Sequence, residues 1–219
     1  MKIALLGAES TGKSDLGKLL EQHFMAQRKT VEHIPEYLRS WCDKHKRTPR
    51  VDEQLGIVNE QISQINSAAP CDFLISDTTP LLTAVYSDLL FGDSSLYELA
   101  MPFQSSFDLT LLMGLDMPWV PDGIQRDGPH RREPVDAKIR AALARGGIPF
   151  QVVYGLGVER LQHALQCLKT PMFDSADQIK IKPKPKPQSQ SQKLRNWVCE
   201  RCSDPECEHR LFQDLLKNS

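Results

Sequence analysis

The segment GAESTGKS at residues 7–14 constrains the fold of this chain more than any other. It matches the phosphate-loop pattern G-x-x-x-x-G-K-[ST] at every fixed position. Apolar residues 3–6 come directly before it, and residues 13–27 after it repeat leucine and phenylalanine at helical spacing. A phosphate loop requires a strand before it and a helix after it, and the sequence predicts both.

The loop residues predict a site for a nucleotide triphosphate such as ATP. Two glycines let the backbone turn tightly, so that successive N–H groups converge on phosphate oxygens beside the positive end of the next helix. Lys13 supplies a charge for the β- and γ-phosphates, and the hydroxyl of Ser14 is a ligand for Mg²⁺. We expect all eight loop residues to contact the nucleotide: Gly7, Ala8, Glu9, Ser10, Thr11, Gly12, Lys13 and Ser14.

Short β-rich apolar runs alternate with helical patterns through the first 168 residues, which is typical of an α/β fold with a parallel sheet. We predict about five strands, at residues 2–6, 30–34, 73–76, 109–113 and 150–154. Helices are predicted at residues 13–27, 52–67, 81–90, 135–145 and 158–168. The predicted fold is a P-loop NTPase sheet flanked by helices, in a domain of residues 1–168.

Charge and hydropathy exclude some functions. The net charge of −1 gives no overall electrostatic attraction to nucleic acid or to an anionic membrane. The first apolar run is too short for a signal-peptide core, and no later stretch approaches the length of a membrane span. We therefore expect a cytoplasmic protein, in which the scattered Cys42, Cys71 and Cys167 are buried free thiols.

The stretch Phe73-Leu74-Ile75-Ser76-Asp77 predicts a second carboxylate beside the phosphate loop. An apolar strand that ends in Asp places an anion at a rigid strand end, where it can hold an Mg²⁺-bound water or the substrate. Asp77 is also a candidate N-cap for the next helix, because Thr78-Thr79-Pro80 reads as a helix start. We favour the metal or substrate role.

The stretch His33-Ile34-Pro35-Glu36-Tyr37-Leu38-Arg39 comes at the end of the second predicted strand. In open α/β sheets, the carboxyl ends of the strands face the ligand crevice. A carboxylate at Glu36 can accept a hydrogen bond from an acceptor hydroxyl and orient it for attack, while Tyr37 and Arg39 help to hold the substrate or the helix. The alternative is a surface turn with a Glu–Arg pair.

The segment after the fourth predicted strand has the composition of a hinged lid. Prolines and a glycine punctuate residues 115–126, and His130 lies among three arginines, Arg126, Arg131 and Arg132. Closure of such a lid excludes water, and an arginine that reaches the transferred phosphoryl group stabilises its charge in the transition state. We select Arg126 and Arg131 as catalytic candidates. Trp119 is either a substrate contact or a packed hinge residue.

Together these motifs resemble the kinase domain of NadR-type ribosylnicotinamide kinases, with which AAA-type P-loop ATPase domains are grouped. The resemblance covers residues 1–168 and rests on the succession of GAESTGKS, Pro35-Glu36-Tyr37-x-Arg39, Ile75-Ser76-Asp77-Thr78 and Asp116-x-Pro118-Trp119-x-x-Asp122-Gly123. It implies transfer of phosphate from ATP to nicotinamide riboside, giving nicotinamide mononucleotide.

The resemblance also implies roles for single residues. Lys13 and Ser14 serve ATP and Mg²⁺, and Asp77 and Glu36 face the metal and the ribose. Trp119 lies near the base, where an aromatic ring suits a cationic pyridinium. Asp122 belongs to the same motif and is counted with the substrate-binding residues.

The composition changes after residue 168. Residues 169–192 are a Lys/Pro/Ser/Gln linker, because alternating lysine and proline favours an extended chain; nucleic acid is a less favoured partner for these lysines. Residues 193–219 hold C-x2-C followed by C-x-H, a ligand set for a structural Zn²⁺. Reactive thiols and an incidental tail are the alternatives to this site at Cys199, Cys202, Cys207 and His209.

Two classes of function remain open on the sequence. The favoured one is an ATP- and Mg²⁺-dependent small-molecule kinase with a nucleoside-like acceptor, preferably nicotinamide riboside. The other is a P-loop ATPase or regulatory switch whose zinc-binding tail docks a protein partner or nucleic acid. A kinase needs an acceptor carboxylate and a closable lid, and the sequence offers candidates for both.

Overall fold

The computed structural model describes residues 1–120 and 129–169. All described elements lie in the first of two units into which the chain divides, Met1–Met172; the second, Phe173–Ser219, is outside the described residues. Asp122, Arg126, the zinc ligands and residues 170–192 of the predicted linker are therefore outside them too, whereas Lys169, the first predicted linker residue, ends the last described helix. No helix within the described ranges is long and apolar enough to cross a membrane.

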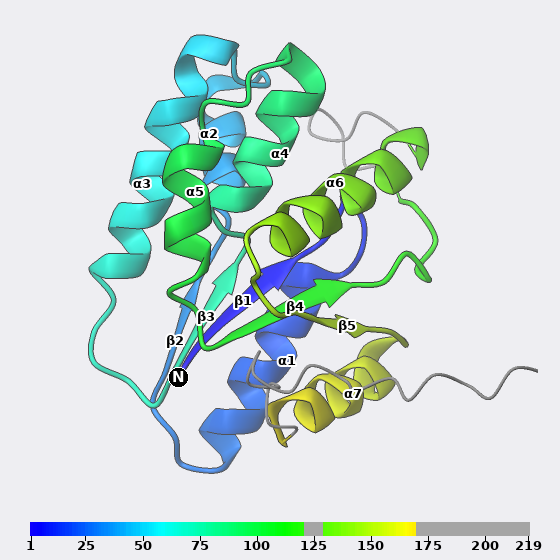
Figure 1. The fold of residues 1–219 in the computed structure, drawn as a ribbon. Helices are drawn as coiled ribbons and strands as arrows, with labels where there is room; N and C mark the ends of the chain where they lie inside the picture. Colours follow the sequence, from blue (N-terminus) through cyan, green and yellow to red (C-terminus); the bar gives the residue numbers. More distant parts are fainter. Residues whose placement is uncertain (121–128, 170–219) are drawn as a thin grey trace, which may run out of the picture. The chain divides into compact units, whose positions relative to one another are not determined.

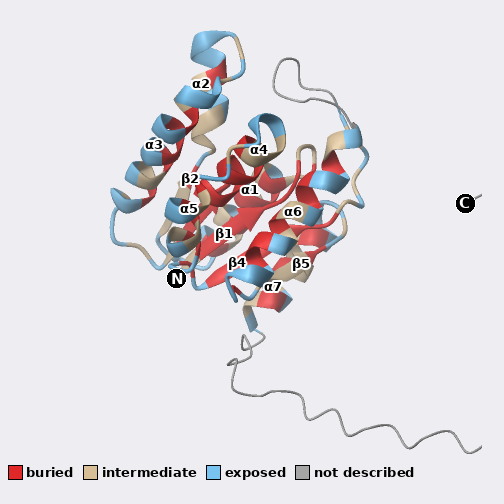
Figure 2. Cartoon of the chain, turned by 45° about the horizontal axis from the view of Figure 1, so that its top comes forward, coloured by how far each residue is buried: buried red, intermediate tan, exposed pale blue. Residues whose placement is uncertain are grey.

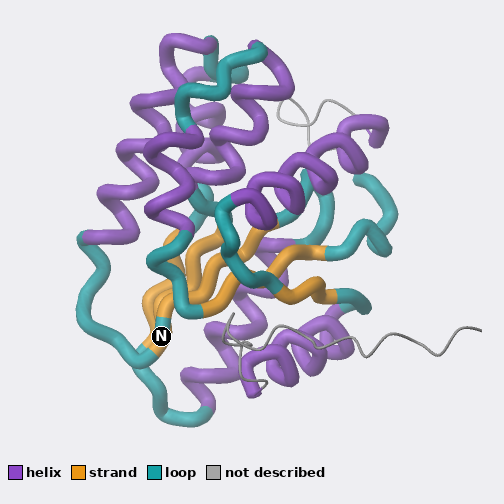
Figure 3. Tube along the Cα trace, viewed as in Figure 1, coloured by secondary structure: helices purple, strands orange, loops and turns teal. Residues whose placement is uncertain are grey.

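A five-stranded sheet forms the centre of this unit (Figures 1 and 3). Its strand order is β2-β3-β1-β4-β5, and every neighbouring pair is parallel, as predicted. The strands are β1 Lys2–Leu6, β2 Val31–Ile34, β3 Phe73–Asp77, β4 Leu109–Met113 and β5 Gln151–Val153. Because the strands are parallel, all five carboxyl ends meet at one edge of the sheet.

Helices cover both faces of the sheet (Figure 1). One face carries α1 (Lys13–Ala26) and α7 (Gly157–Lys169), and the other carries the remaining helices. These are α2 Tyr37–His45, α3 Gln54–Asn66, α4 Pro80–Phe91, α5 Tyr97–Gln104 and α6 Arg132–Arg145, with short 3-10 turns at Val51–Glu53 and Pro129–Arg131.

The central strand β1 has no polar face, and Figure 2 shows it within the buried interior. Ile3 and Leu5 pack on the side of α1 and α7, whereas Leu6 packs on the opposite side with α4 and α6. A strand covered on both faces reads as a continuous apolar run, because neither face meets water. The run before the phosphate loop thus reflects the central position of β1.

Two helices were not predicted from the sequence. The first, α2, has Leu38, Trp41 and Cys42 at helical spacing, but it is only nine residues long and buries only Cys42, so its periodic signal is weak. The second, α5, contains Pro102, a residue that usually ends a helix. The other predicted elements are present, with ends shifted by up to about three residues. Of the three predicted buried thiols, Cys42 and Cys167 are buried and Cys71 is half-buried; all three are free.

A candidate nucleotide and acceptor site

The phosphate loop joins β1 to α1 and depends on both its glycines. Gly7 and Gly12 have φ values of +154° and +75°. A Cβ atom added to Gly7 would lie 2.8 Å from the Oγ1 of Thr11, and one added to Gly12 would lie 2.7 Å from the Sδ of Met117. A larger residue at either position would be strained and would also clash, so this loop conformation requires glycine.

Lys13 lies folded back over the loop. Its Nζ donates hydrogen bonds to the carbonyls of Gly7 and Ala8, each at 3.0 Å, and the residue is 9% exposed. The hydroxyl of Thr11 also donates to the carbonyl of Ala8, at 2.7 Å. The ammonium group is therefore held at the mouth of the loop by two neutral acceptors, which anionic phosphate oxygens can replace.

Asp77 ends β3 next to the phosphate loop. Its Cα partner in the sheet is Leu5 of β1, two residues before the loop begins. The carboxylate is 4% exposed, and its Oδ1 has no hydrogen-bond partner among the described residues. The N-cap of α4 is instead Thr79, and no described side chain caps the helix. Asp77 thus does not serve as the helix cap that the sequence left open.

The residue after Asp77 is strained. Thr78 has a φ of +80°, which is rare for a β-branched residue and costs about 1–3 kcal/mol. Its N–H donates to the carbonyl of Leu5 at 3.1 Å, and its carbonyl accepts from the hydroxyl of Ser76 at 2.5 Å. The Oγ1 of Thr78 is buried without a partner among the described residues. Two unsatisfied oxygens therefore lie at this strand end.

These oxygens fit a nucleotide-bound magnesium ion better than a metal held by protein alone. Within the described ranges, no three His, Cys, Asp or Glu side chains are grouped to hold a metal ion. Mg²⁺ typically takes one or two protein oxygens and completes its shell with phosphates and water. The donor set expected for it here, the hydroxyl of Ser14 and the carboxylate of Asp77, is of that kind.

A cavity of about 600 Å³ adjoins the phosphate loop on the side of α2, α3 and α4. It is lined at one end by residues of the phosphate loop and by Arg131 at the base of the predicted lid, and elsewhere by mainly apolar side chains. The lining residues are Glu9, Ser10, Lys13, Glu36, Leu38, Arg39, Cys42, Thr48, Pro49, Arg50, Val51, Gln54, Leu82, Thr83, Tyr86, Leu90, Phe91 and Arg131.

Glu36 lies in the cavity wall at the first turn of α2. Its carboxylate is 3.8 Å from Nη2 of Arg39, which lines the same cavity. Buried Gln61 of α3 holds the backbone on both sides of Glu36: its Oε1 accepts from the N–H of Tyr37 at 2.7 Å, and its Nε2 donates to the carbonyl of Pro35 at 3.3 Å. The Glu–Arg pair anticipated for a surface turn therefore exists, but it borders the cavity.

Two buried, uncharged polar side chains line the cavity wall. Gln54 is 4% exposed and Thr83 is 5% exposed. The amide of Gln54 can donate and accept hydrogen bonds, and so can the hydroxyl of Thr83. Both groups are uncharged, so they suit a neutral polar group on the ligand.

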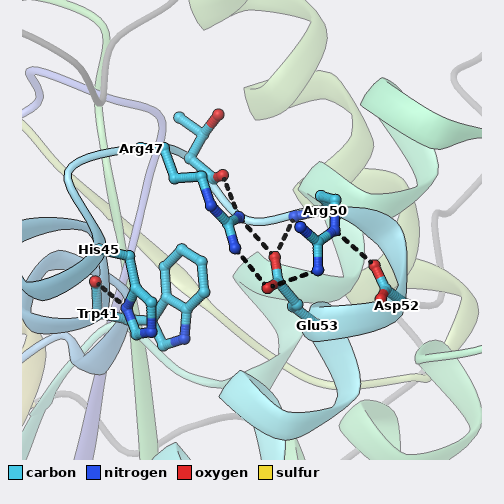
Figure 4. A network of polar contacts seen from close by, with 7 residues as sticks. Trp41, His45, Arg47, Arg50, Asp52 and Glu53 are labelled. Carbon is cyan, nitrogen blue, oxygen red and sulfur yellow. Dashed lines mark hydrogen bonds and ion pairs between the residues drawn. The ribbon is translucent and has the colours of Figure 1, made fainter.

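The outer wall of the cavity, residues 48–51, is held by the polar network in Figure 4. Arg47 donates to both carboxylate oxygens of Glu53, at 2.6 and 2.7 Å, and its guanidinium lies 4.9 Å from the ring centre of Trp41. Trp41 in turn stacks on His45. The hydrogen bonds from Arg47 and from the backbone N–H of Arg50 lower the pKa of Glu53 to about 2.

Cys42 faces the same cavity. Burial raises the pKa of its thiol to about 11, and the nearby charge of Glu36 acts in the same direction. Only the thiolate is a strong nucleophile, so this thiol is inert near neutral pH. Cys42 is therefore an apolar part of the wall.

The segment after β4 passes over the phosphate loop. The backbone N–H of Val120 donates to the hydroxyl of Ser10 at 2.8 Å. Trp119 does not line the cavity, and its indole Nε1 is buried without a partner among the described residues. Two predicted substrate residues, Trp119 and Tyr37, thus lie outside the cavity wall, and their roles stay predictions.

Two lid arginines differ in their surroundings. Arg131 lines the cavity. Arg132 is 8% exposed, and its Nη1 donates to the carbonyl of Met117 at 2.7 Å. Its Nε and Nη2 are buried without hydrogen-bond partners in the described residues. Sequence reasoning placed Arg132 in the lid cluster but selected Arg126 and Arg131; the structure adds Arg132 as a candidate for an anion.

Much of the cavity wall was missed by sequence reasoning. Gln54, Thr83 and the apolar residues of α4 lie on helices at positions that read as ordinary core. The arginine at position 160 reads as part of a surface helix and yet is buried. Only the unpredicted helix α2, together with the turn after it, brings residues 38–51 to the site.

Comparison with known proteins agrees with this geometry. A family model described as an AAA domain matches residues 2–160. The chain belongs to this AAA domain family. No curated protein matches it significantly.

Solved structures of kinases share the fold. The structure of NadR protein in complex with NR matches with a TM-score of 0.58 at 19% identity, over 76% of this chain and 49% of that chain. Thymidylate kinase from Ehrlichia chaffeensis gives 0.58 at 13% identity, over 77% and 98%. Deoxyadenosine kinase from M. mycoides gives 0.53 at 17% identity, over 77% and 99%.

The match spans about half of the NadR chain and nearly all of the other two kinases. At these identities the likeness establishes the fold. The AAA domain family and the NadR-like kinase fold confirm the resemblance seen in the sequence motifs.

Proposed function

We propose that the chain is a cytoplasmic ATP- and Mg²⁺-dependent kinase of a small nucleoside-like molecule, with nicotinamide riboside as the preferred acceptor and NAD salvage as its role. The observation that carries the proposal is one cavity lined both by Lys13 of the phosphate loop and by Glu36. The free cysteines suit a reducing compartment. The fold shared with NadR and two other kinases supports the same reaction class.

The phosphate end of the cavity suits the triphosphate. The backbone N–H groups of the loop and the ammonium of Lys13 bind the phosphates, and Arg131 and Arg132 supply further positive charge from the lid base. Magnesium, when bound, neutralises charge on the phosphates. Ser14 and Asp77 are the residues that would hold it.

The acceptor end suits a hydroxyl beside Glu36. This carboxylate accepts the hydrogen bond of the hydroxyl and orients its oxygen toward the γ-phosphate, and Arg39 pairs with the carboxylate at 3.8 Å. We expect closure of the lid predicted at residues 115–126 to exclude water, which favours transfer over hydrolysis. Glu36 is thus the residue that separates a kinase from a hydrolase.

The far part of the cavity suits a planar ring with a neutral polar substituent. Tyr86 and Phe91 supply aromatic surface, and Gln54 and Thr83 supply uncharged hydrogen-bonding groups. A pyridinium ring favours the aromatic faces, and a carboxamide matches the donor and acceptor of the Gln54 amide. These features favour nicotinamide riboside over an acceptor with a carboxylate on the ring.

The test uses the full-length protein with Mg²⁺-ATP and a panel of nucleosides, with phosphorylated product and free phosphate measured separately. We expect product from nicotinamide riboside, less from nicotinic acid riboside, and little free phosphate. If only another nucleoside were phosphorylated, the proposed acceptor would be wrong, but the kinase activity would stand.

The AAA domain family match also favours the second function class, an ATPase or regulatory switch with a docking tail. The same assay separates the kinase from the switch, because a switch releases free phosphate at the same rate whether or not any nucleoside is present. A result of that kind would overturn the kinase proposal.

A further inference from the structure

Arg160 of α7 is a buried cation that the proposed reaction does not use. The residue is 3% exposed, and its guanidinium joins three separate segments. Nε donates to the carbonyl of Gly155 at 2.7 Å, and Nη2 donates to Oδ1 of Asp116 at 2.6 Å. Nη1 donates to the carbonyl of Thr11 in the phosphate loop and lies 3.1 Å from the Sδ of Met117.

The contact with Thr11 determines the direction of the next N–H group. In a planar trans peptide, the carbonyl and the following N–H point in opposite directions. Because the carbonyl of Thr11 points at Arg160, the N–H of Gly12 points away from it. A Cβ on Gly12 would lie 3.2 Å from Nη1 of Arg160, so the guanidinium packs directly against this part of the loop.

Asp116 fixes the guanidinium from the other side. Its second oxygen, Oδ2, accepts from the N–H of Gly155 at 2.7 Å, so one carboxylate holds both Arg160 and the turn before α7. Asp116 also belongs to the segment after β4 that passes over the phosphate loop. Removing Asp116 would leave the buried charge of Arg160 unpaired, and removing either partner frees the groups that the pair held to shift.

We propose that Arg160 is a positioning residue of the phosphate loop. Through the carbonyl of Thr11 it orients the loop's N–H groups toward the phosphates, and through Asp116 it ties the loop to the root of the lid. Arg160 therefore affects the affinity for triphosphates and not the KM for the acceptor. The inference rests on the proposed nucleotide site, but it is independent of which acceptor is used.

The experiment compares full-length wild type with Arg160→Met and Arg160→Lys. Affinities for a nonhydrolysable ATP analogue and for inorganic tripolyphosphate are measured by calorimetry. We expect Arg160→Met to weaken both by roughly ten- to a hundredfold, since a displacement of about 1 Å in a positioned group has effects of that size. The acceptor KM in the remaining activity should stay within about twofold. Arg160→Lys should recover only part of the loss, because one ammonium cannot make the forked contacts.

Lys138→Met is the matched control. Lys138 is a partly buried cation that pairs with Asp88 at 2.5 Å between α6 and α4, and it does not line the cavity. It should lower the melting temperature without changing either affinity. Where Arg160→Met fails to fold, Asp116→Asn replaces it in the same measurement. In the Arg160→Lys background, Asp116→Asn should cause little further loss of triphosphate affinity.

Unchanged triphosphate affinity in folded Arg160→Met would overturn the positioning role, and so would an equal loss in triphosphate affinity and acceptor KM. Wild-type protein that binds neither probe would instead refute the nucleotide site itself. The two failures are therefore distinguishable.

Discussion

The two ends of the cavity arise from the chain in different ways. The core of the phosphate end is one continuous segment, residues 7–14, whose turns require glycines that are visible in the sequence. The acceptor end is assembled from the carboxyl end of β2, the short helix α2, the turn at residues 46–53, and one side of α4. A local motif identifies the cofactor, whereas acceptor specificity depends on packing between distant segments.

The largest expected effect is at the phosphate end. Lys13→Ala should abolish detectable phosphoryl transfer, because it removes the mobile charge on the β- and γ-phosphates. Lys13 is buried, so the variant loses two hydrogen bonds, but the carbonyl of Ala8 keeps its hydrogen bond from the hydroxyl of Thr11. We expect a melting temperature only a few degrees lower. Loss of the cooperative melting transition would show that Lys13 is structural as well.

Glu36→Gln tests the junction of the two ends. The amide keeps the shape of the side chain but accepts a weaker hydrogen bond from the acceptor. We expect the rate of transfer to fall by roughly 10²–10⁴-fold while ATP affinity stays within a factor of about three. Rapid-quench measurement of one turnover separates the chemical step from product release. Normal turnover would remove Glu36 from the site and leave Asp77 as the acceptor-side carboxylate.

Gln54→Leu examines acceptor specificity alone. The substitution keeps the volume of the wall but removes its hydrogen-bonding amide. We expect the KM for nicotinamide riboside to rise by about tenfold, the equivalent of one hydrogen bond, with kcat and ATP affinity nearly unchanged. The variant should also discriminate less between nicotinamide riboside and nicotinic acid riboside. Leu55→Ala on an exposed position of the same helix is the control, since Leu55 does not line the cavity.

The sequence predicted what local chemistry determines. The five strands, their parallel arrangement and the phosphate loop were all predicted, because apolar runs, glycines and a lysine at fixed spacing express them directly. Asp77 was expected at a strand end beside the loop, but its exact register opposite Leu5 could not be predicted. The strained φ of Thr78 left no trace in the sequence. The burial of Arg160 also depends on three segments that meet only in the fold.

Arg47→Met should loosen the outer wall and have a smaller effect. Without Arg47, Glu53 keeps only its contacts with Arg50, and residues 48–51 lose their anchor. We expect the acceptor KM to rise about threefold and ATP affinity to stay the same, since one partly exposed ion pair has a modest effect. Calorimetric titration with each ligand separates these two quantities.

The same pair predicts a pH response. In the folded protein the pKa of Glu53 is lowered to about 2. The stabilisation that its ionised carboxylate gives to the wall is therefore present above the ordinary carboxyl range and is lost as the pH falls toward the folded value. Between about pH 5 and pH 8, Glu53 therefore stays ionised and should not change the acceptor KM. A pH dependence of KM in that range that disappears in Glu53→Gln would contradict this account.

The smallest expected effect on turnover comes from truncation after Lys169. The phosphate loop, Glu36 and every described lining residue of the cavity lie within residues 1–169, so turnover on a free nucleoside should change by less than about twofold. The Lys-Pro linker predicted at residues 169–192 would give no fixed pose to the predicted zinc-binding segment at residues 193–219.

Full-length protein should bind about one Zn²⁺, and Cys199→Ser should weaken this sharply, because three protein ligands hold the metal less well than four. Metal analysis that finds no zinc in reductant-treated protein would refute the zinc site. A truncated protein that binds ATP but transfers no phosphate would show that the tail takes part in catalysis, and the comparison between the two ends of the cavity would then need a third component.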